Sequence, residues 1–405
     1  MEVVTQRPDS SEIVYNLSPS LANGFGGSRA MASAFRAIFF SFILLSCFTA
    51  RVAAGPYEDA KAAFVRGDVA TALRLLRPLA DQGNADAQRA LAILFLTGRG
   101  VPRDDAEAVK WLRKAAAQGD AIAQCLLGHA HATSQGLEDD FKAAARPQQA
   151  ADQGNAVAQC VLGLMYQSGD GVPQDDVESA KWFRKAADQG NAYAQLGLAL
   201  LYHLGRGAPR DDAAAAKWLR MAADQGHADA QAELGFMFEI GQGVSQDRAE
   251  AAKWYRLAAD QGNAVAQFRL GYMYSYGAGV AEDRVEAAKW LRKSADRGNT
   301  DAQALLGAAY AAGQGVLQDY AEAVKWLRLA ADQGNSAGQW FLGTMYIEGY
   351  GVPQNYAIAH MWLNLGAAGG NKEAAKQRDA LTAEMTSEQI AEAQRLAREW
   401  KPGQK

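Results

Sequence analysis

Tryptophan recurs along this chain at a fixed interval of 36 residues. The marks are Trp182, Trp218, Trp254, Trp290, Trp326 and Trp362, and a glycine eight residues after each mark closes the unit. Units of this kind fill residues 84–370, about eight in all. A period of this length is typical of an array of small supersecondary units that cannot fold alone and bury a common core by stacking.

Each unit predicts two helices. In the unit from Asn155, that asparagine is placed to cap a first helix, helix A. The glycines before Pro173 end helix A, because glycine permits positive φ and proline lacks a backbone donor. Asp175 or Asp176 then caps helix B, and Gly190 stops it in the left-handed conformation.

Side-chain spacing within helix B predicts one buried stripe and one solvated face. The expected buried residues are Ala180, Trp182, Phe183, Ala186 and Ala187. On the other face a glutamate precedes a lysine by three residues in several units, as in Glu107 and Lys110 or Glu286 and Lys289. Such pairs support a solvated helix surface.

The unit carries the elements A-x-A-Q-x-x-L-G, G-x-G-V and A-x-x-W-x-x-x-A-A-x-x-G. In these it resembles the Sel-one-like repeat (SLR), a relative of the tetratricopeptide repeat, over residues 84–370. The resemblance implies an all-α, right-handed superhelical solenoid of stacked antiparallel helix pairs. It also implies a non-catalytic adaptor or scaffold, with relatives in the bacterial envelope and among secreted proteins.

The remaining segments are expected to flank or interrupt the array. Residues 55–83 and 371–405 are predicted to form helical caps, the second with a capping box between Thr386 and Gln389. The unit at residues 120–154 is degenerate, because Arg146 replaces its tryptophan and Pro147 follows inside helix B. Proline in a helix interior kinks the axis, so this unit predicts a bend or a loosened joint.

The N-terminal segment indicates export. Residues 1–30 have no apolar period and are either disordered or a mis-assigned start, whereas residues 31–54 from Met31 have the basic, apolar and small-residue order of a signal peptide cleaved after Ala54. We therefore predict a periplasmic or secreted protein with no membrane span after signal removal. The alternative is an envelope lipoprotein anchored at Cys47.

The composition and motifs exclude several function classes. A formal net charge of -4 offers no excess positive field for nucleic acid. The chain has no Ser-x-x-Lys, Ser-Asp-Asn or Lys-Thr-Gly triplet, no HExxH motif and no phosphate loop. We therefore expect neither enzymatic activity nor a cofactor or metal.

Variation among the units predicts where a partner binds. Positions that vary on helix A lie three and four residues apart and so gather on one helix face, and in SLR proteins helix A lines the concave side. The predicted partner-binding residues are Tyr193, His203, Phe236, Glu239, Phe268, Tyr272, Tyr276, Trp340, Ile347 and Glu348. The competing interpretation is that several of these side chains pack between neighbouring A helices.

Two functions from different classes remain open, and the relatives suggest a third. The first is a monomeric envelope scaffold that binds a protein or peptide partner on the concave helix-A surface. The alternative is a cell-wall module that binds peptidoglycan or another glycan through its aromatic side chains. Some secreted SLR relatives are linked to β-lactam hydrolysis, but this chain lacks the motifs of that chemistry.

Overall fold

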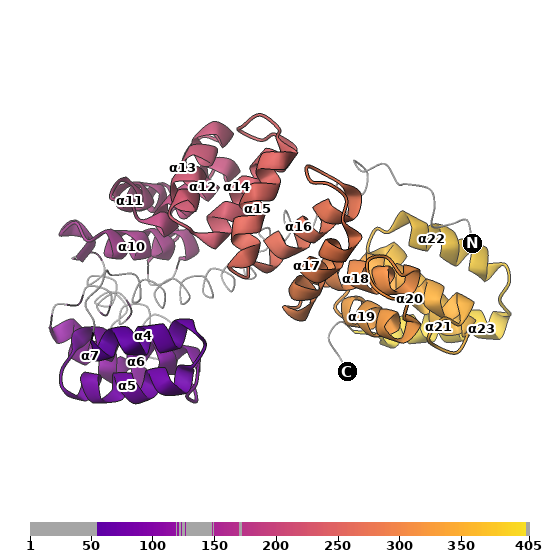
Figure 1. The fold of residues 1–405 in the computed structure, drawn as a ribbon, viewed down its shortest axis with the longest axis horizontal. Coiled ribbons are helices and arrows are strands. Elements are labelled where there is room, and N and C mark those ends of the chain that lie inside the picture. Colours follow the sequence, from indigo (N-terminus) through magenta and orange to yellow (C-terminus); the bar gives the residue numbers. More distant parts are fainter. Residues whose placement is uncertain are drawn as a thin grey trace. The chain divides into compact units, whose positions relative to one another are not determined.

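The computed structural model describes residues 55–118, 150–169 and 172–401, together with Asp120, Ala123, Leu126 and Gln148. The predicted leader at residues 31–54 and most of the degenerate unit, including Arg146 and Pro147, lie outside the described residues. Every regular element within them is an α-helix, which confirms the all-α class (Figure 1). The chain divides into two compact units, one ending at Gln225 and one beginning at Gly226.

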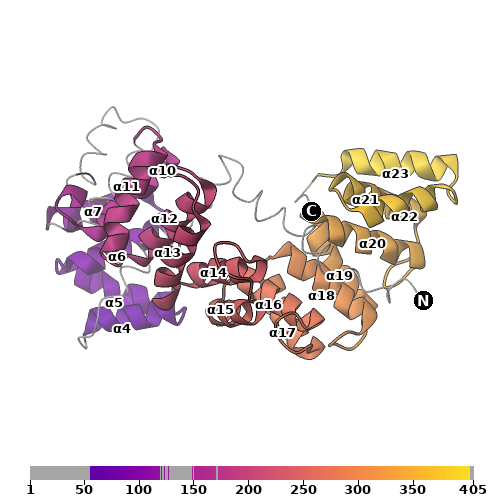
Figure 2. The ribbon, with the colours of Figure 1, turned by 90° about the horizontal axis from the view of Figure 1, so that it is seen from above.

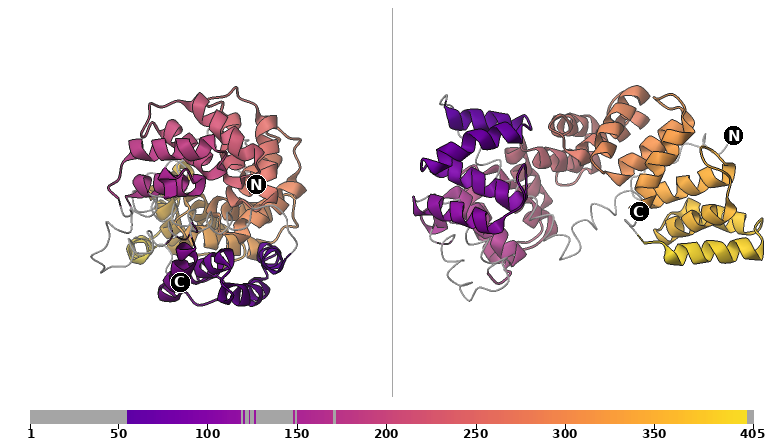
Figure 3. Two further views of the ribbon diagram at one scale, coloured as in Figure 1. Left: turned by 90° about the vertical axis from the view of Figure 1, so that its left-hand side faces the viewer. Right: turned by 90° about the horizontal axis from the view of Figure 1, so that it is seen from below.

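The N-terminal unit consists of helix pairs in chain order, each helix contacting the next where the pairs are continuous. In the right panel of Figure 3, its first two pairs are the indigo and purple helices. The helices are α4 (Pro56–Val65), α5 (Val69–Asp81), α6 (Ala85–Thr97), α7 (Asp105–Ala117), α10 (Ala156–Ser168), α11 (Asp176–Asp188), α12 (Ala192–Leu204) and α13 (Asp212–Asp224).

The C-terminal unit repeats the same pairing without interruption, and its last two helices both pack on α21 (Figure 2). The helices are α14 (Ala228–Ile240), α15 (Arg248–Asp260), α16 (Ala264–Tyr276), α17 (Arg284–Asp296), α18 (Thr300–Ala312), α19 (Tyr320–Asp332), α20 (Ser336–Glu348), α21 (Tyr356–Ala368), α22 (Lys372–Thr382) and α23 (Ser387–Glu399).

The helix ends follow the local chemistry of the sequence. The Asn155 side chain accepts a hydrogen bond from Ala158 N at 2.9 Å and starts α10. Asp175 rather than Asp176 caps α11, accepting from Val177 N at 2.9 Å. Gly190 follows α11 with φ +87°, and Thr386 opens α23 with the predicted capping box. These caps are confirmed because each depends only on residues within one turn.

One detail of the predicted helix B stripe is wrong. Trp182, Phe183, Ala186 and Ala187 are buried as expected, but Ala180 is only half-buried. Ser179 takes the buried place instead, and its hydroxyl donates to the Gly163 carbonyl of α10 at 2.7 Å. A polar side chain is tolerated there because it satisfies a buried acceptor on the neighbouring helix.

The two helices of a pair have different surroundings. Helix A is buried on most sides, as in α10, where nearly every residue from Ala158 to Gly163 is inaccessible to solvent. Helix B is buried along one stripe and presents lysines and acidic residues to solvent. Consecutive A helices also touch directly, since α18 contacts α20. Helix A is therefore the more buried helix of the pair, and only part of one side of it is exposed to solvent.

Glutamines link each pair to the pair before it, an arrangement that we call the glutamine ladder. Gln159 of α10 donates to the carbonyl of Ala151 at 3.0 Å, and Gln189 after α11 donates to Gln159 Oε1 at 2.7 Å. The same bonds recur in the C-terminal unit from Gln303 to Ala295 and from Gln333 to Gln303, at 3.2 and 3.0 Å. The glutamines of the A-x-A-Q and D-Q-G elements thus hold the stack together through buried hydrogen bonds.

An arginine on helix B joins the aromatic residues of the following pair. Arg292 of α17 donates to the Tyr310 hydroxyl of α18 at 2.8 Å, and its guanidinium lies 5.0 Å from the Trp326 ring centroid. Arg184 makes the equivalent contacts with Tyr202 and Trp218. Tryptophan is therefore both a core residue and a cation–π partner, and the arginine that contacts it lies two residues after the tryptophan of the preceding unit.

Close approach within a pair requires a glycine in helix A. A Cβ on Gly163 would lie 2.7 Å from the Phe183 ring, and one on Gly271 would lie 2.9 Å from Leu291. Either contact is closer than van der Waals packing allows, so alanine would force the pair apart.

The solvated face of helix B has the predicted ion pairs. Glu107 and Lys110 lie 3.2 Å apart, and Glu286 and Lys289 lie 3.1 Å apart. Glu286 also accepts a hydrogen bond from Trp290 Nε1 at 2.8 Å. The glutamate therefore orients the tryptophan as well as pairing with the lysine.

Candidate functional site

Five of the ten predicted partner-binding residues lie together on α14 and α16 of the C-terminal unit. The α16 aromatics form a row, with ring centroids 6.4 Å apart from Phe268 to Tyr272 and 4.7 Å apart from Tyr272 to Tyr276. Phe236 and Glu239 of α14 both contact Arg269, which comes from α16. The structure thus gathers these residues at one place between two consecutive A helices.

Burial separates these five residues into two groups. Phe268, Tyr272 and Glu239 are 4%, 6% and 8% exposed, and Phe268 packs in the core cluster that contains Trp326. Tyr276 is 46% exposed, and Phe236 is half-buried. Tyr276 and Phe236 are therefore accessible to solvent, whereas Phe268, Tyr272 and Glu239 belong to the interior.

Five polar side chains of α14, α15 and α16 interact with one another, and we call them the α14–α16 polar cluster. Its members are Glu233, Glu239, Tyr255, Arg269 and Tyr272. The Tyr255 hydroxyl donates to Glu239 Oε2 at 2.7 Å, and Arg269 Nη1 lies 3.7 Å from Glu239 Oε1. The Arg269 guanidinium also covers the Phe236 ring, 5.2 Å from its centroid. Glu239 and Arg269 form a buried ion pair, which requires such neighbours to offset the loss of hydration.

Glu233 differs from Glu239 because it makes no hydrogen bond or ion pair within the described residues. Its side chain is half-buried on α14, one helical turn after Asp229. Burial raises the pKa of Glu233 to about 7, the charge of Asp229 raises it further, and Arg269 opposes the rise. A half-buried carboxyl that changes charge near neutral pH is a common property of functional sites.

Tyr255 and Tyr272 have raised pKa values for related reasons. Burial raises the pKa of Tyr255 well above its usual value, and the charge of Glu239 adds to this. Burial also raises the pKa of Tyr272 to about 12. Both phenols are therefore neutral hydrogen-bonding groups at physiological pH.

Sequence reasoning missed Glu233 and Arg269, which occupy the same position of helix A in consecutive units. The corresponding residues in other described units are Ala90, Val161, Gly197, Leu305 and Phe341. Two charged residues in a column that is otherwise apolar were the available signal.

The other five predicted residues lie on α12 and α20. Tyr193 is half-buried against the core of the N-terminal unit, and His203 Nδ1 lies 2.8 Å from Asp212 Oδ1. On α20, Trp340 donates to Gln377 of α22 at 2.9 Å. Ile347 is half-buried and Glu348 is exposed.

Five side chains on the A helices of the C-terminal unit are at least partly exposed, and we call them together the helix-A face. Its members are Glu233, Phe236, Tyr276, Ile347 and Glu348.

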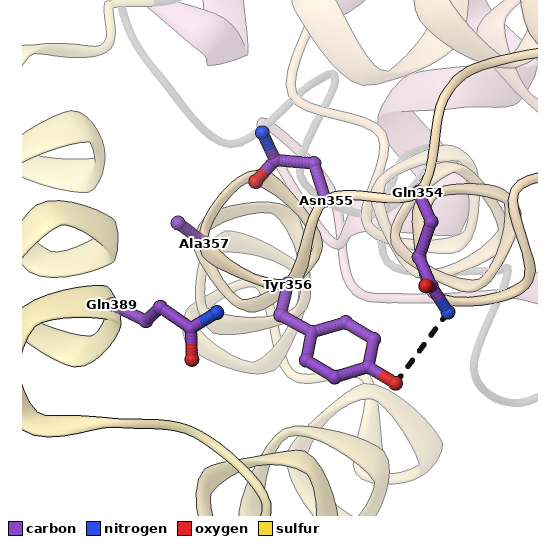
Figure 4. Close-up of a pocket in the computed structure, with 5 residues that line it drawn as sticks. All are labelled: Gln354, Asn355, Tyr356, Ala357 and Gln389. Atoms are coloured by element: carbon purple, nitrogen blue, oxygen red, sulfur yellow. Dashed lines mark hydrogen bonds between the residues drawn. The ribbon is translucent and has the colours of Figure 1, made fainter.

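A shallow pocket of about 450 Å³ lies where α21 begins, next to α23 (Figure 4). It is lined by Gln354, Asn355, Tyr356, Ala357 and Gln389. The Gln354 amide donates to the Tyr356 hydroxyl at 3.4 Å, and the Asn355 side chain is occupied in capping α21. The pocket thus offers few polar groups that are free to orient a small ligand.

The described residues hold neither a cluster of metal-ligating side chains nor a long apolar helix. No group of three or more His, Cys, Asp or Glu side chains among them could hold a metal ion. Likewise, none of the helices described is long and apolar enough to cross a bilayer. His203, with its single carboxylate partner Asp212, is accordingly a surface ion-pair residue when protonated.

Comparison with known proteins identifies similar repeats along most of the chain. The Sel1 repeat family matches residues 85–120, 121–146, 156–191, 192–227, 228–263, 264–299, 300–335 and 336–371. A Sel1 repeat protein from Oxalobacter formigenes is 35% identical, with 82% of this chain and 95% of that chain covered and a TM-score of 0.55. A protective antigen of uropathogenic Escherichia coli with an SLR fold is 31% identical over 85% of this chain and 83% of its own, with a TM-score of 0.48. No protein with a curated description matches the chain.

Proposed function

Because the chain belongs to the Sel1 repeat family, we propose that it is a non-catalytic scaffold that binds a protein or an extended peptide on its helix-A face. The observation that carries the proposal is the charged and aromatic character of α14 and α16. Glu233 and Arg269 stand where stacking needs only apolar side chains, and Tyr276 is left half exposed. Exposed aromatic residues beside charged groups are typical anchors of protein interfaces.

The proposed location is the bacterial envelope. It rests on the signal-like pattern of residues 31–54, which sets the partner among periplasmic, secreted or cell-wall components. Lipid attachment at Cys47 is the alternative route to the same compartment. Detection of the protein in the periplasmic fraction, with an N-terminus after Ala54, would support the proposal, and an intact chain in the cytosol would contradict it.

The burial of individual residues determines which variants can test the binding surface. Alanine at Phe268 or Tyr272 would open the core, so loss of binding in such variants would not distinguish a contact from a folding defect. Tyr276→Ala removes an accessible ring from α16 instead. Leu257→Ala is the matched control, because Leu257 is 48% exposed on helix B of the preceding pair.

The experiment is capture of partners from a periplasmic extract on the immobilised protein, in parallel with sedimentation on purified cell wall. We expect a defined protein to be retained by the wild type and by Leu257→Ala, and to be reduced about tenfold by Tyr276→Ala, as for a residue at the centre of an interface. Equal retention by all three proteins would refute the helix-A face. Retention only on cell wall would identify a glycan-binding module instead.

A further inference from the structure

One histidine is buried where the last repeat meets α22 and α23, the two helices that form the C-terminal cap. His360 lies on α21 and is 7% exposed. The residues two before the tryptophan in the other described repeats, at the same position of helix B, are Val109, Ala180, Ala216, Ala252, Ala288 and Val324. Stacking therefore needs only a small apolar side chain at this position. A polar, titratable ring there is a feature of the C-terminal end alone among the described repeats.

The contacts of His360 determine which of its ring nitrogens carries the hydrogen. Nε2 lies 3.1 Å from the Thr382 hydroxyl of α22. That hydroxyl already donates its hydrogen to the Arg378 carbonyl at 2.8 Å, so it accepts from His360. The ring is therefore neutral, with its hydrogen on Nε2 and a lone pair on Nδ1. Nδ1 is buried and has no hydrogen-bond partner among the described residues.

The surroundings of His360 oppose its protonation. Arg378 of α22 donates from Nη1 to the Asn364 side chain of α21 at 3.1 Å, one turn after His360, and it also pairs with the exposed Asp379 at 2.7 Å. Burial lowers the pKa of His360, Arg378 lowers it further, and Asp379 opposes the decrease. The helices α20 and α23 also pack on α21, but the charged groups that act on this ring among the described residues are those of α22.

Protonation would weaken the attachment of the cap to the last repeat. An imidazolium carries a hydrogen on both nitrogens, so Nδ1 would become a buried donor without an acceptor, near the Arg378 guanidinium. The hydrogen bond from His360 to Thr382 joins α21 to the end of α22, just before α23 begins. On α23 the contact is aromatic, since the Trp400 ring that follows it lies 6.1 Å from the ring of Trp362 on α21.

The first half of α22 is held by contacts that do not depend on pH. Gln377 accepts hydrogen bonds from Trp340 Nε1 and from the Thr344 hydroxyl of α20, both at 2.9 Å. None of these three side chains titrates near neutral pH. Acid would therefore act on the part of the cap that follows Gln377, which is the end of α22 and the whole of α23.

We propose that the C-terminal cap is released by acid, because protonation of His360 separates the end of α22 and α23 from α21. This inference does not depend on the scaffold function proposed above. The direction follows from linkage, since a histidine whose pKa is lowered by the closed cap binds its proton more strongly once the cap opens. The closed cap is thus fully stable above the usual histidine pKa of about 6.5, and it loses stability as the pH falls from there through the lowered pKa of His360.

The test is hydrogen exchange of α23 in the full chain, measured by mass spectrometry at pH 7, 6 and 5. His360→Gln keeps a donor for Thr382 but does not titrate, and His360→Ala introduces the residue found at this position in other repeats. His203→Gln is the matched control, because it removes a partly exposed histidine from the N-terminal unit. Rates are compared between proteins at the same pH, which cancels the intrinsic pH dependence of exchange.

We expect the exchange rate of α23 in the wild type, relative to His360→Gln, to rise about tenfold between pH 7 and pH 5, within the limit of tenfold per pH unit for one group. The relative rate of α16 should stay constant, and His203→Gln should behave as the wild type. No rise in the wild type, or the same rise in both His360 variants, would overturn the inference. An equal rise in α16 would also overturn it, because acid would then be unfolding the whole unit.

Discussion

The α10 and α12 helices of the N-terminal unit and the α14 and α16 helices of the C-terminal unit follow the same repeat but present different chemistry. Val161 and Gly197 occupy the positions that Glu233 and Arg269 occupy in α14 and α16. The glutamine ladder and the arginine contacts to tyrosine and tryptophan are the same in both places. The comparison shows that stacking constrains a small set of positions and leaves the other positions of helix A free to diverge.

The strongest test of the shared stacking geometry is to substitute a glycine that lies between the two helices of one pair. Gly315 has φ +72°, and a Cβ there would overlap the Arg284 carbonyl of the preceding pair. We expect Gly315→Ala to lower the free energy of unfolding by about 3 kcal/mol, from left-handed strain plus overpacking. Thermal unfolding followed by circular dichroism measures it.

Gly334→Ala is the control for backbone strain alone. Gly334 has φ +85° but nothing within 4 Å of the added Cβ. The expected loss is about 1 kcal/mol. Equal losses for the two alanines would mean that close contact between pairs contributes nothing.

The glutamine ladder should be equally important in both units. Gln195→Ala and Gln303→Ala each remove one bond to a helix-end carbonyl and one from the closing glutamine. We expect each substitution to destabilise its unit by about 2 kcal/mol, since a net buried hydrogen bond contributes about 1 kcal/mol. Hydrogen exchange of the two units, measured separately by mass spectrometry, would reveal the effect. A loss of stability in only one unit would show that the glutamine ladder does not stabilise the two units equally.

The smallest expected effect is a change in the pH dependence of stability, and of the two regions only that of α14 and α16 should show it. The folded pKa of Glu233 is raised to about 7, so the unfolded state loses its proton first as the pH rises. The destabilisation by Glu233 therefore grows as the pH rises from the unfolded pKa of this carboxyl to pH 7, and it is complete above pH 7. We expect Glu233→Gln to stabilise the C-terminal unit by about 1 kcal/mol at pH 8, and the gain to vanish near pH 4.

Glu348→Gln is the matched control, because it makes the same substitution at an exposed position of α20. A Glu233→Gln variant that is less stable than wild type at pH 8 would show that Glu233 is a structural residue. The expected gain is typical of a residue kept for function at a cost in stability.

Several features could be predicted from residues close together in the sequence. The 36-residue period is visible in the sequence itself. The caps at Asn155 and Asp175 and the pair Glu286–Lys289 follow from contacts within one or two helical turns. The all-α class and the order of the pairs followed from the same evidence. Helical structure is local, so the sequence alone was sufficient to determine these features.

Only the tertiary structure decided which side chains of helix A a partner can reach. Phe268 and Tyr272 belong to a variable column but are buried, whereas Glu233 belongs to an apolar column and remains accessible. The physical reason is that the contacts that bury a side chain of helix A join residues far apart in the sequence. Burial on helix A depends on residues of neighbouring pairs, as in the contact of Arg269 with Glu239, and helical periodicity carries no information about such contacts.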